Sequence, residues 1–266
     1  MKSLMNKVLL VTGASSGIGQ QIALNAAAEG AHLVLVARRR TELVRLAKIL
    51  TEHYGTKILV ITADLTDPVQ IERTVAKATD SYGHIDVLVN AAGFGEFKPA
   101  IEFSYQEIEA MFQVNTHAMM YLSQLVSVEM IKRQSGHIFF IASIAGKLAT
   151  PSSGVYSATK SAIISYANAL RLELKRDHVH VTTVNPGPVA TPFFHRTPSL
   201  TNYYQRIQKF TLRPEQVAQS VLDAIGTPKR EITQPWLLKW GARLNNFAPA
   251  IGDYFTLNML NYKEDR

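Results

Sequence analysis

The chain has 266 residues, of which 47% are hydrophobic and 18% charged, values that permit one large buried core and exclude a disordered chain. Its 28 Lys and Arg residues exceed its 21 Asp and Glu residues, giving a net charge of +7. No run of about five or more basic residues occurs, so we expect no nucleic-acid-binding arm; a phosphorylated ligand, an anionic membrane and a solvated surface stay open. The sequence holds no cysteine, which excludes disulfides, thiolate metal ligands and cysteine nucleophiles, and we expect no bound metal.

The N-terminal apolar run Val8–Val11 leads directly into a glycine motif. It is too short for the apolar region of a signal peptide, so we interpret it as a buried strand. No apolar stretch reaches the roughly 18 residues that a transmembrane helix needs. We therefore expect a cytoplasmic protein.

Strand-like runs recur along the chain, and most are apolar throughout, as in a parallel sheet covered on both faces. Helix-length segments separate them, which indicates repeated strand–helix–strand units. We predict a single-domain α/β Rossmann fold over residues 1–234, with a doubly wound parallel sheet of about seven strands and helices on both faces. Residues 235–266 are expected to form an apolar helical extension of the same domain. The expected strands are Lys7–Thr12, His32–Ala37, Ile58–Ala63, Asp86–Asn90, His137–Ser143, Val179–Asn185 and Glu231–Thr233, and the clearest helices are Ile18–Glu29, Thr41–His53, Pro68–Tyr82, Tyr156–Arg176 and Pro214–Ile225.

A glycine-rich turn follows the first expected strand and opens the first expected helix. It reads Thr12-Gly13-Ala14-Ser15-Ser16-Gly17-Ile18-Gly19, with the spacing G-x-x-x-G-x-G. Glycines let the backbone approach a pyrophosphate, which the positive end of the following helix attracts. An ordinary corner between strand and helix is the alternative. The placement favours nucleotide binding by Gly13, Ser15, Ser16, Gly17, Ile18 and Gly19.

The end of the second strand selects the form of the cofactor. An acidic residue there would hold the ribose 2′-hydroxyl of NAD, whereas this chain has Ala37 followed by Arg38, Arg39 and Arg40. A guanidinium pairs with a 2′-phosphate through charge-assisted hydrogen bonds. The sequence therefore predicts NADP(H), with Arg38 as the favoured contact and Arg39 beside it. The alternative is that the arginines only solvate the start of a helix.

Two further strand ends are expected to face the cofactor. After the third strand, Asp64 and Leu65 would lie near the adenine, although Asp64 could instead cap a helix. The fourth strand ends in small residues that leave room for a cofactor ribose. The expected contacts there are Asn90, Ala91 and Gly93.

Four polar residues form a candidate catalytic group. Tyr156 and Lys160 are four residues apart on an expected helix and share one face. Ser143 ends the preceding strand, at the carboxyl edge where open α/β sheets bind ligands, and Asn115 lies in the helix after the fourth strand. Tyrosine, with a usual pKa of about 10, is a poor acid or base at neutral pH, but a nearby ammonium and an oxidised nicotinamide ring would both lower that pKa. Ser143 could then hold the substrate oxygen.

Together these motifs resemble the short-chain dehydrogenase/reductase superfamily over residues 5–192. The resemblance implies that Tyr156 is the acid/base, that Lys160 binds the nicotinamide ribose, that Ser143 orients the carbonyl and that Asn115 holds a proton-relay water. It further implies cofactor contacts after the sixth strand, with the nicotinamide carboxamide on the last of them. These contacts are Pro186, Gly187, Val189 and Thr191.

The predicted function is that of an NADP(H)-dependent oxidoreductase, which reduces a ketone or aldehyde or oxidises the matching alcohol. Two rivals stay open. The long segment after the seventh strand disfavours a 3-oxoacyl-carrier-protein reductase, and the intact catalytic set disfavours a non-catalytic NADP(H)-sensing protein. The aromatic residues of the loops could line a pocket for an apolar substrate or could serve ordinary packing, and the sequence favours neither. The nearby His195 and Arg196 mean that an anionic substrate is also possible. The loop residues are Phe94, Phe97, Leu148, Phe193, Phe194, Tyr203 and Tyr204.

Two expectations concern assembly and the tail. The helices Asn115–Lys132 and Tyr156–Arg176 are rich in small or apolar residues, and the resemblance implies that they pack on twofold mates in a homodimer or homotetramer. The tail is expected to form two short helices separated by Pro249, with Leu237, Trp240, Leu244 and Phe247 on one stripe. Packing on the domain or on a subunit mate is the favoured use of the stripe, and a lid over the substrate cleft and peripheral docking on a membrane stay open.

Overall fold

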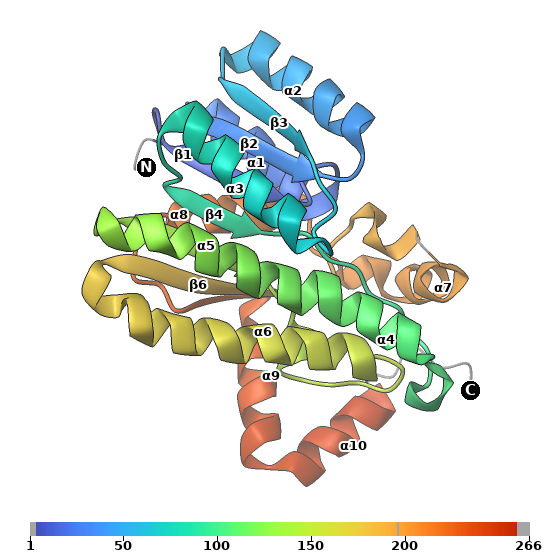
Figure 1. The fold of residues 1–266 in the computed structure, drawn as a ribbon. Coiled ribbons are helices and arrows are strands. Elements are labelled where there is room, and N and C mark those ends of the chain that lie inside the picture. Colours follow the sequence, from blue (N-terminus) through green and yellow to red (C-terminus); the bar gives the residue numbers. More distant parts are fainter. Residues whose placement is uncertain (1–3, 196, 260–266) are drawn as a thin grey trace.

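The structure is a computed structural model that describes residues 4–195 and 197–259. A seven-stranded parallel sheet forms its centre, in the order β3-β2-β1-β4-β5-β6-β7, with helices on both faces (Figure 1). This is the single Rossmann-type domain that the alternation of strands and helices predicts. The strands are β1 (Val8–Thr12), β2 (His32–Ala37), β3 (Ile58–Thr62), β4 (Val87–Asn90), β5 (Gly136–Ile141), β6 (Val179–Pro186) and β7 (Glu231–Gln234).

Continuous apolar runs form the central strands because both faces of the sheet are covered. Every residue of β1 is buried. Successive side chains of a strand point to opposite faces, so Leu9 and Val11 pack into one layer while Val8 and Leu10 pack into the other.

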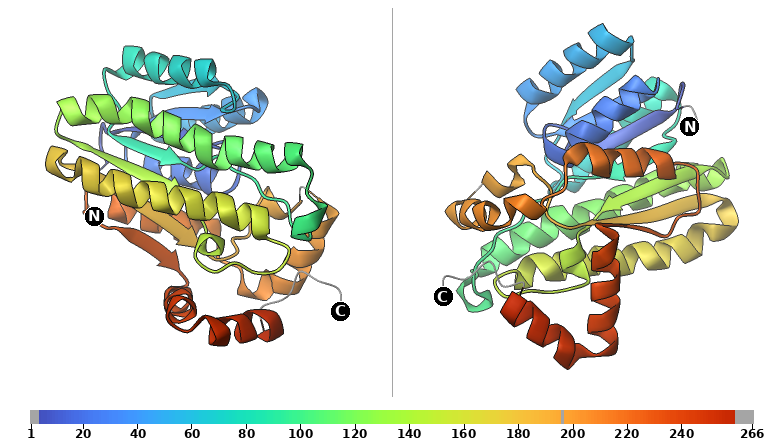
Figure 2. Two further views of the ribbon diagram at one scale, coloured as in Figure 1. Left: turned by 60° about the horizontal axis from the view of Figure 1, so that its bottom comes forward. Right: turned by 180° about the vertical axis from the view of Figure 1, so that it is seen from behind.

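Two layers of helices enclose the sheet. Helices α1, α2 and α8 pack on the face reached by Leu9, and α3, α5 and α6 pack on the face reached by Leu10 (Figure 2). The helices are α1 (Gly17–Ala28), α2 (Arg40–Tyr54), α3 (Pro68–Tyr82), α4 (Tyr105–Phe112), α5 (Ala118–Lys132), α6 (Gly154–Glu173), α7 (Pro198–Ile207), α8 (Pro214–Ala224), α9 (Trp236–Phe247) and α10 (Pro249–Met259).

Helix α7 has no counterpart among the elements that the sequence predicts. It forms because Thr197 caps its first turn, accepting a hydrogen bond from the Leu200 amide at 3.4 Å, and because Pro198 stands at its start. The Ser199 hydroxyl donates to the Phe97 carbonyl at 2.5 Å. This bond ties α7 to the loop after β4, above the carboxyl edge of the sheet.

The strand order locates the region where ligands bind. The chain moves outward from β1 to β3 and then returns to place β4 on the other side of β1. At such a reversal the loops after neighbouring strands diverge and leave a crevice at the carboxyl ends.

The tail forms two helices, α9 and α10, with the second beginning at Pro249, as predicted. They extend away from the sheet beside β7 (Figure 1). Leu237, Trp240, Leu244 and Phe247 are all exposed, so the stripe does not pack on the domain, whereas packing on a subunit mate stays a prediction. None of the helices in the described part of the chain is long and apolar enough to span a membrane.

Candidate active site

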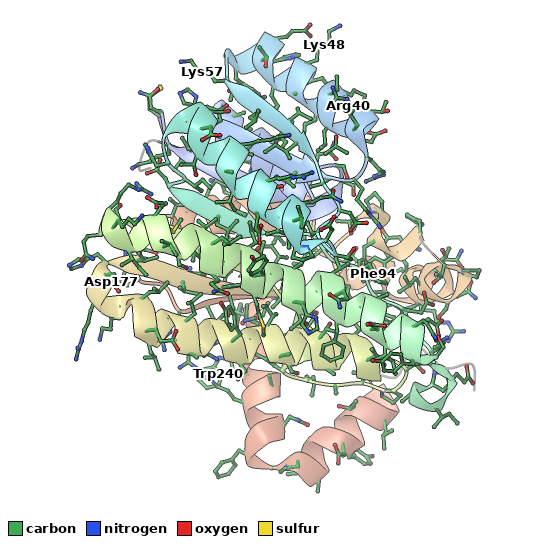
Figure 3. All side chains as sticks on the ribbon, in the orientation of Figure 1. Arg40, Lys48, Lys57, Phe94, Asp177 and Trp240 are labelled. Atoms are coloured by element: carbon green, nitrogen blue, oxygen red, sulfur yellow. The ribbon has the colours of Figure 1, made fainter. Side chains whose placement is uncertain are left out.

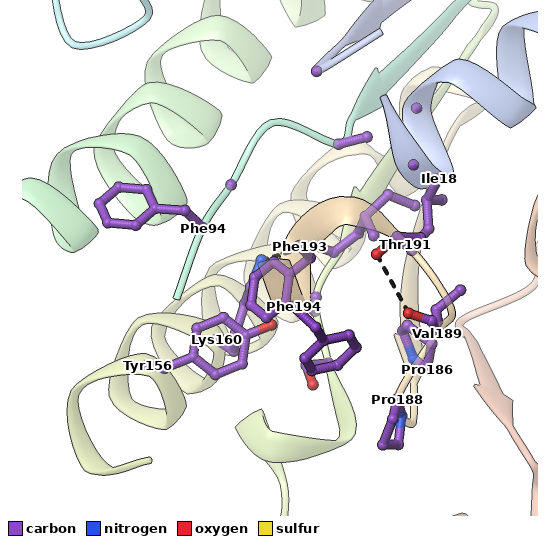
Figure 4. Close-up of a pocket in the computed structure, with 18 of the residues that line it drawn as sticks. Ile18, Phe94, Tyr156, Lys160, Pro186, Pro188, Val189, Thr191, Phe193 and Phe194 are labelled. Atoms are coloured by element: carbon purple, nitrogen blue, oxygen red, sulfur yellow. Dashed lines mark hydrogen bonds between the residues drawn. The ribbon is translucent and has the colours of Figure 1, made fainter. Parts of the chain in front are cut away.

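A cavity of about 870 Å³ lies along the carboxyl edge of the sheet (Figure 4). It is lined by the glycine turn and the ends of β2 and β3 together with the residues that follow β5 and β6. Sequence reasoning placed most of these residues in one site, and the structure brings them together. The predicted residues that line the cavity are Gly13, Ser15, Ser16, Gly17, Ile18, Gly19, Arg38, Arg39, Asp64, Leu65, Ala91, Gly93, Ser143, Tyr156, Lys160, Pro186, Gly187, Val189 and Thr191.

Two glycines of the turn, Gly13 and Gly19, have no room for a side chain. A Cβ on Gly13, whose φ is +66°, would lie 2.8 Å from the Ala91 carbonyl oxygen. A Cβ on Gly19 would lie 2.7 Å from the Gly13 oxygen. Glycine at these two positions lets the start of α1 and the loop after β4 pack closely against the end of β1, and the turn as a whole lines the cavity.

The N-terminus of α1 differs from those of α3 and α4. The Asp67 carboxylate caps α3, and Ser104 and Glu107 form a complete capping box on α4. Ser16 precedes α1 and makes no side-chain cap hydrogen bond. The first turn of α1 thus keeps backbone donors and the positive end of its dipole for an anionic group.

Thr12, the last residue of β1, was not predicted to have a role of its own. Its buried Oγ1 accepts hydrogen bonds from the amides of Ala91 at 3.0 Å and Ala92 at 3.1 Å. It thereby fixes the loop after β4 beside the glycine turn. The position of this threonine, at the end of a strand and directly before a glycine motif, could have suggested this role from the sequence.

Positive charge lies at the end of β2. The Arg39 guanidinium donates to the Ser15 hydroxyl at 3.0 Å and to the Ser15 carbonyl at 3.2 Å, which holds it over the glycine turn. Arg38 is exposed and lines the cavity, and Ala37 contributes no carboxylate. This end of the cavity is suited to a phosphate.

Asp64 and Asn90 differ in how they relate to the cavity. Asp64 lines it while accepting from the amide and the hydroxyl of Thr66 at 3.0 and 2.9 Å, so it stabilises a turn, and Asp67 is the residue that caps α3. Asn90 does not line the cavity. Its side chain is buried and donates to the Ser123 hydroxyl on α5 at 2.9 Å, because the alternation along β4 turns it toward the face of the sheet that α5 covers.

Tyr156 and Lys160 lie one turn apart on α6, and Ser143 follows β5 opposite them. Burial raises the pKa of Tyr156 to about 12, while a hydrogen bond from Ser143 acts in the opposite direction. The lowering expected from an ammonium and an oxidised nicotinamide together concerns the complex with cofactor and stays a prediction. Lys160 Nζ lies 5.7 Å from the centre of the Tyr156 ring and donates to the Ile141 carbonyl at 2.9 Å. Burial also lowers the pKa of Lys160 to about 8.

Asn115 is buried in a π-helical turn, Gln113–His117, between α4 and α5. Its amide group accepts from the Phe94 amide at 3.0 Å and donates to the Phe94 carbonyl at 2.7 Å. It also donates to Thr159 Oγ1 at 3.1 Å, and that hydroxyl donates to the Tyr156 carbonyl at 2.8 Å. Asn115 therefore ties the loop after β4 to the helix that carries Tyr156. π-turns of this kind are frequent at functional sites.

Aromatic rings surround Tyr156 at the other end of the cavity (Figure 4). The rings of Phe97 and Phe193 lie 5.7 and 5.8 Å from that of Tyr156, centre to centre. Tyr203 from α7 lies 5.4 Å from Phe97 and closes the wall. This end of the cavity is thus apolar apart from its hydroxyl groups and the Lys160 ammonium. Arg196, which left an anionic substrate open, lies outside the described residues.

A glycine-lined end and a Ser–Tyr–Lys end in one cavity define a nucleotide-binding enzyme of the Rossmann type. The family model for short chain dehydrogenase matches residues 7–200. An uncharacterized oxidoreductase of Staphylococcus aureus (strain USA300) is 33% identical over 229 residues, which span 86% of this chain and 95% of the relative. The chain therefore belongs to the short chain dehydrogenase family.

Solved structures share this architecture. A short chain dehydrogenase/reductase from Burkholderia phymatum, in complex with NAD, matches with a TM-score of 0.86 at 24% identity, over 94% of this chain and 96% of that one. The L-sorbose reductase of Gluconobacter frateurii, in complex with NADPH and L-sorbose, matches with a TM-score of 0.81 at 27% identity, over 88% of this chain and 97% of that one.

Proposed function

We propose that this protein is an NADP(H)-dependent carbonyl reductase that acts on an apolar ketone or aldehyde. The observation that carries the proposal is the polarity of the cavity along its length. Arg38 and Arg39 line one end, and Tyr156, Ser143 and aromatic rings line the other. A cofactor with a phosphorylated end and a reactive end could lie along the cavity, with its phosphate near the arginines. An apolar carbonyl compound could then bind beside its reactive end, among the aromatic rings.

The residues present fit such a cofactor. The glycine turn and the uncapped first turn of α1 would hold the pyrophosphate, and Arg38 would pair with a 2′-phosphate where NAD-binding chains carry an acidic residue. Arg39, fixed on Ser15, adds a second charge. The solved relatives include one complex with NAD and one with NADPH, so the preference of this chain depends on its own residues at the end of β2.

The catalytic residues would act on a carbonyl group at the end of the cavity. The nicotinamide supplies a hydride when it is bound. Tyr156, with its pKa raised to about 12, stays protonated at neutral pH and can donate its phenolic proton to the carbonyl oxygen. Ser143 would orient that oxygen, and Lys160 would hold the nicotinamide ribose when the cofactor is bound.

The test is a panel of ketones and aldehydes reduced with NADPH and with NADH. We expect NADPH to be preferred by about 10- to 150-fold, the value of a hydrogen bond to a charged group. The double variant Ala37→Asp, Arg38→Ala should reverse this preference. Equal use of both cofactors by the wild type would contradict the assignment of Arg38.

The same panel separates the two rivals. Activity confined to acyl groups on a phosphopantetheine carrier would indicate a 3-oxoacyl-carrier-protein reductase. NADPH binding without turnover of any carbonyl would indicate a sensor.

We further propose a cytoplasmic homo-oligomer that pairs through α5 and α6. These helices expose Val128 and Leu172, together with small residues such as Ser165 and Ala169. Flat helical faces of this composition pack well on a twofold mate. Light scattering at micromolar concentration should give a dimer or tetramer mass, and a monomer would refute the proposal.

A further inference from the structure

The helices α9 and α10 form an apolar arm at the edge of the sheet. Trp236, Trp240 and Phe247 are 65%, 56% and 90% exposed, and Leu244 and Ile251 are exposed beside them. The two helices approach closely where the buried Gly252 of α10 meets α9, since a Cβ on Gly252 would collide with Asn245. Apart from Leu237 and Leu238, which line the cavity, the large apolar side chains named above face solvent, which is unusual for helices that pack on their own domain.

A basic groove adjoins this arm. It is lined by five cationic side chains and a single carboxylate, Glu231, which pairs with Lys147 and, at 3.1 Å, with Lys239. The Arg243 guanidinium lies 4.9 Å from the centre of the Trp240 ring, so the basic groove and the apolar arm meet at α9. The cationic side chains are Lys147, Lys229, Arg230, Lys239 and Arg243.

We propose that α9 and α10 dock on the surface of a membrane rich in anionic lipid. An apolar face bordered by cations, with tryptophans at the boundary, matches the acyl–headgroup boundary of such a surface. α9 has 12 residues and rises about 18 Å, so it lies on a bilayer whose apolar core is about 30 Å thick and does not cross it. A second copy of the chain is the weaker occupant, because a twofold interface here brings the basic groove against its own copy.

Docking brings the cavity to the membrane. Leu237 and Leu238, in the first turn of α9, line the same cavity as Tyr156. The Leu238 side chain packs directly on Gly187, since a Cβ added to Gly187 would lie 2.9 Å from Leu238 Cδ1. An apolar carbonyl compound dissolved in the bilayer thus has a short path to Tyr156. This consequence rests on the proposed function, whereas the docking itself does not.

The sequence supplies its own reporter of docking. It contains two tryptophans, Trp236 and Trp240, and both lie on α9. Intrinsic tryptophan fluorescence therefore reports on this surface alone. We expect vesicles of phosphatidylcholine and phosphatidylglycerol to shift the emission to the blue and brominated lipids to quench it. Vesicles of phosphatidylcholine alone should bind far more weakly.

Variants test the two parts of the surface separately. Lys239→Gln with Arg243→Gln should weaken binding to the anionic vesicles by about 30-fold, since each basic residue near such a surface contributes about fivefold. Leu244→Ser with Phe247→Ser should weaken it by at least about tenfold. The matched controls are Lys48→Gln and Val44→Ser on α2. Lys48 and Trp240 lie at opposite ends of the molecule in Figure 3, and the control variants should bind like the wild type.

Three results would overturn the proposal. The emission could be unchanged by both kinds of vesicle, or the α9 variants could bind like the controls. The blue shift could also appear without vesicles as protein concentration rises, together with a doubled mass, which would show that a second copy covers the arm. The link to the cavity is tested by turnover: anionic vesicles should lower KM for a long-chain ketone and leave KM for a small water-soluble ketone unchanged. If no carbonyl is reduced, the proposed function fails while vesicle binding still stands.

Discussion

The buried ammonium of Lys160 makes a measurable prediction about stability. Burial depresses its pKa from 10.5 to about 8, so the folded protein binds fewer protons than the unfolded chain between these pH values. A pKa shift of 1 unit corresponds to about 1.4 kcal/mol. The burial of the Lys160 ammonium therefore lowers the free energy of unfolding by about 3 kcal/mol below pH 8. The opposing free energy disappears as the pH rises toward 10.5. The stability of the wild type should therefore rise through this window.

The variant Lys160→Met removes the titrating group and keeps an unbranched side chain in its place. Its difference in unfolding free energy from the wild type should change by about 3 kcal/mol between pH 7 and pH 10.5, with the variant relatively more stable at the lower pH. Loss of the hydrogen bond to Ile141 and changes in packing shift the two curves by a constant, so the pH-dependent part isolates the ammonium. The pKa of Tyr156 is raised from 10 to about 12, so this residue contributes stability that is lost as the pH rises above 10, but both proteins keep Tyr156 and its contribution cancels in the difference.

Urea denaturation of both proteins across this pH range measures the difference. Lys48→Met, a change of an exposed lysine on α2, is the control for removing an ammonium group as such. Parallel curves for the wild type and Lys160→Met would refute the reasoning, since they would show that Lys160 keeps the same pKa in the folded and unfolded states.

Three other outcomes are expected. Tyr156→Phe should lower kcat by at least about 10²-fold while NADPH still binds, measured by its fluorescence, because only the proton donor is lost; a near-normal rate would remove Tyr156 from the mechanism. Gly19→Ala should abolish cofactor binding in a titration, because its Cβ would meet a backbone oxygen at 2.7 Å, whereas Gly241→Ala, with nothing within 4 Å, should bind normally. Thr159→Val should lower the unfolding free energy by about 1–3 kcal/mol by leaving a buried amide of Asn115 unpaired, and an unchanged urea midpoint would contradict this.

Local patterns predicted the sheet well. All seven strands lie within two residues of their expected bounds, because continuous apolar runs and the glycine turn are signals that short segments carry by themselves. The cavity follows from the same logic, since the carboxyl ends of parallel strands share one edge.

Long-range contacts account for what the sequence did not reveal. The side chain of Asn115 is committed to Phe94 and Thr159 across the fold, and only the π-turn shows how it reaches both. The raised pKa of Tyr156 depends on burial beside Phe97 and Phe193, which come from the segments after β4 and β6, and no local pattern shows that these segments meet at α6. The exposure of Trp240 likewise depends on how α9 and α10 pack on each other, which no periodicity within one helix specifies.

The uncapped start of α1 has a consequence for the lifetime of the protein. Ser16 gives no cap hydrogen bond, so an anion seated on this turn completes the helix and adds to the stability of the folded chain. A ligand at about 100 times its dissociation constant adds about 2.7 kcal/mol by mass action. The fraction of open chains available to proteases then falls by about a hundredfold. The abundance of this protein should therefore follow the supply of the anion that α1 holds, so that chains are degraded fastest when that supply is depleted.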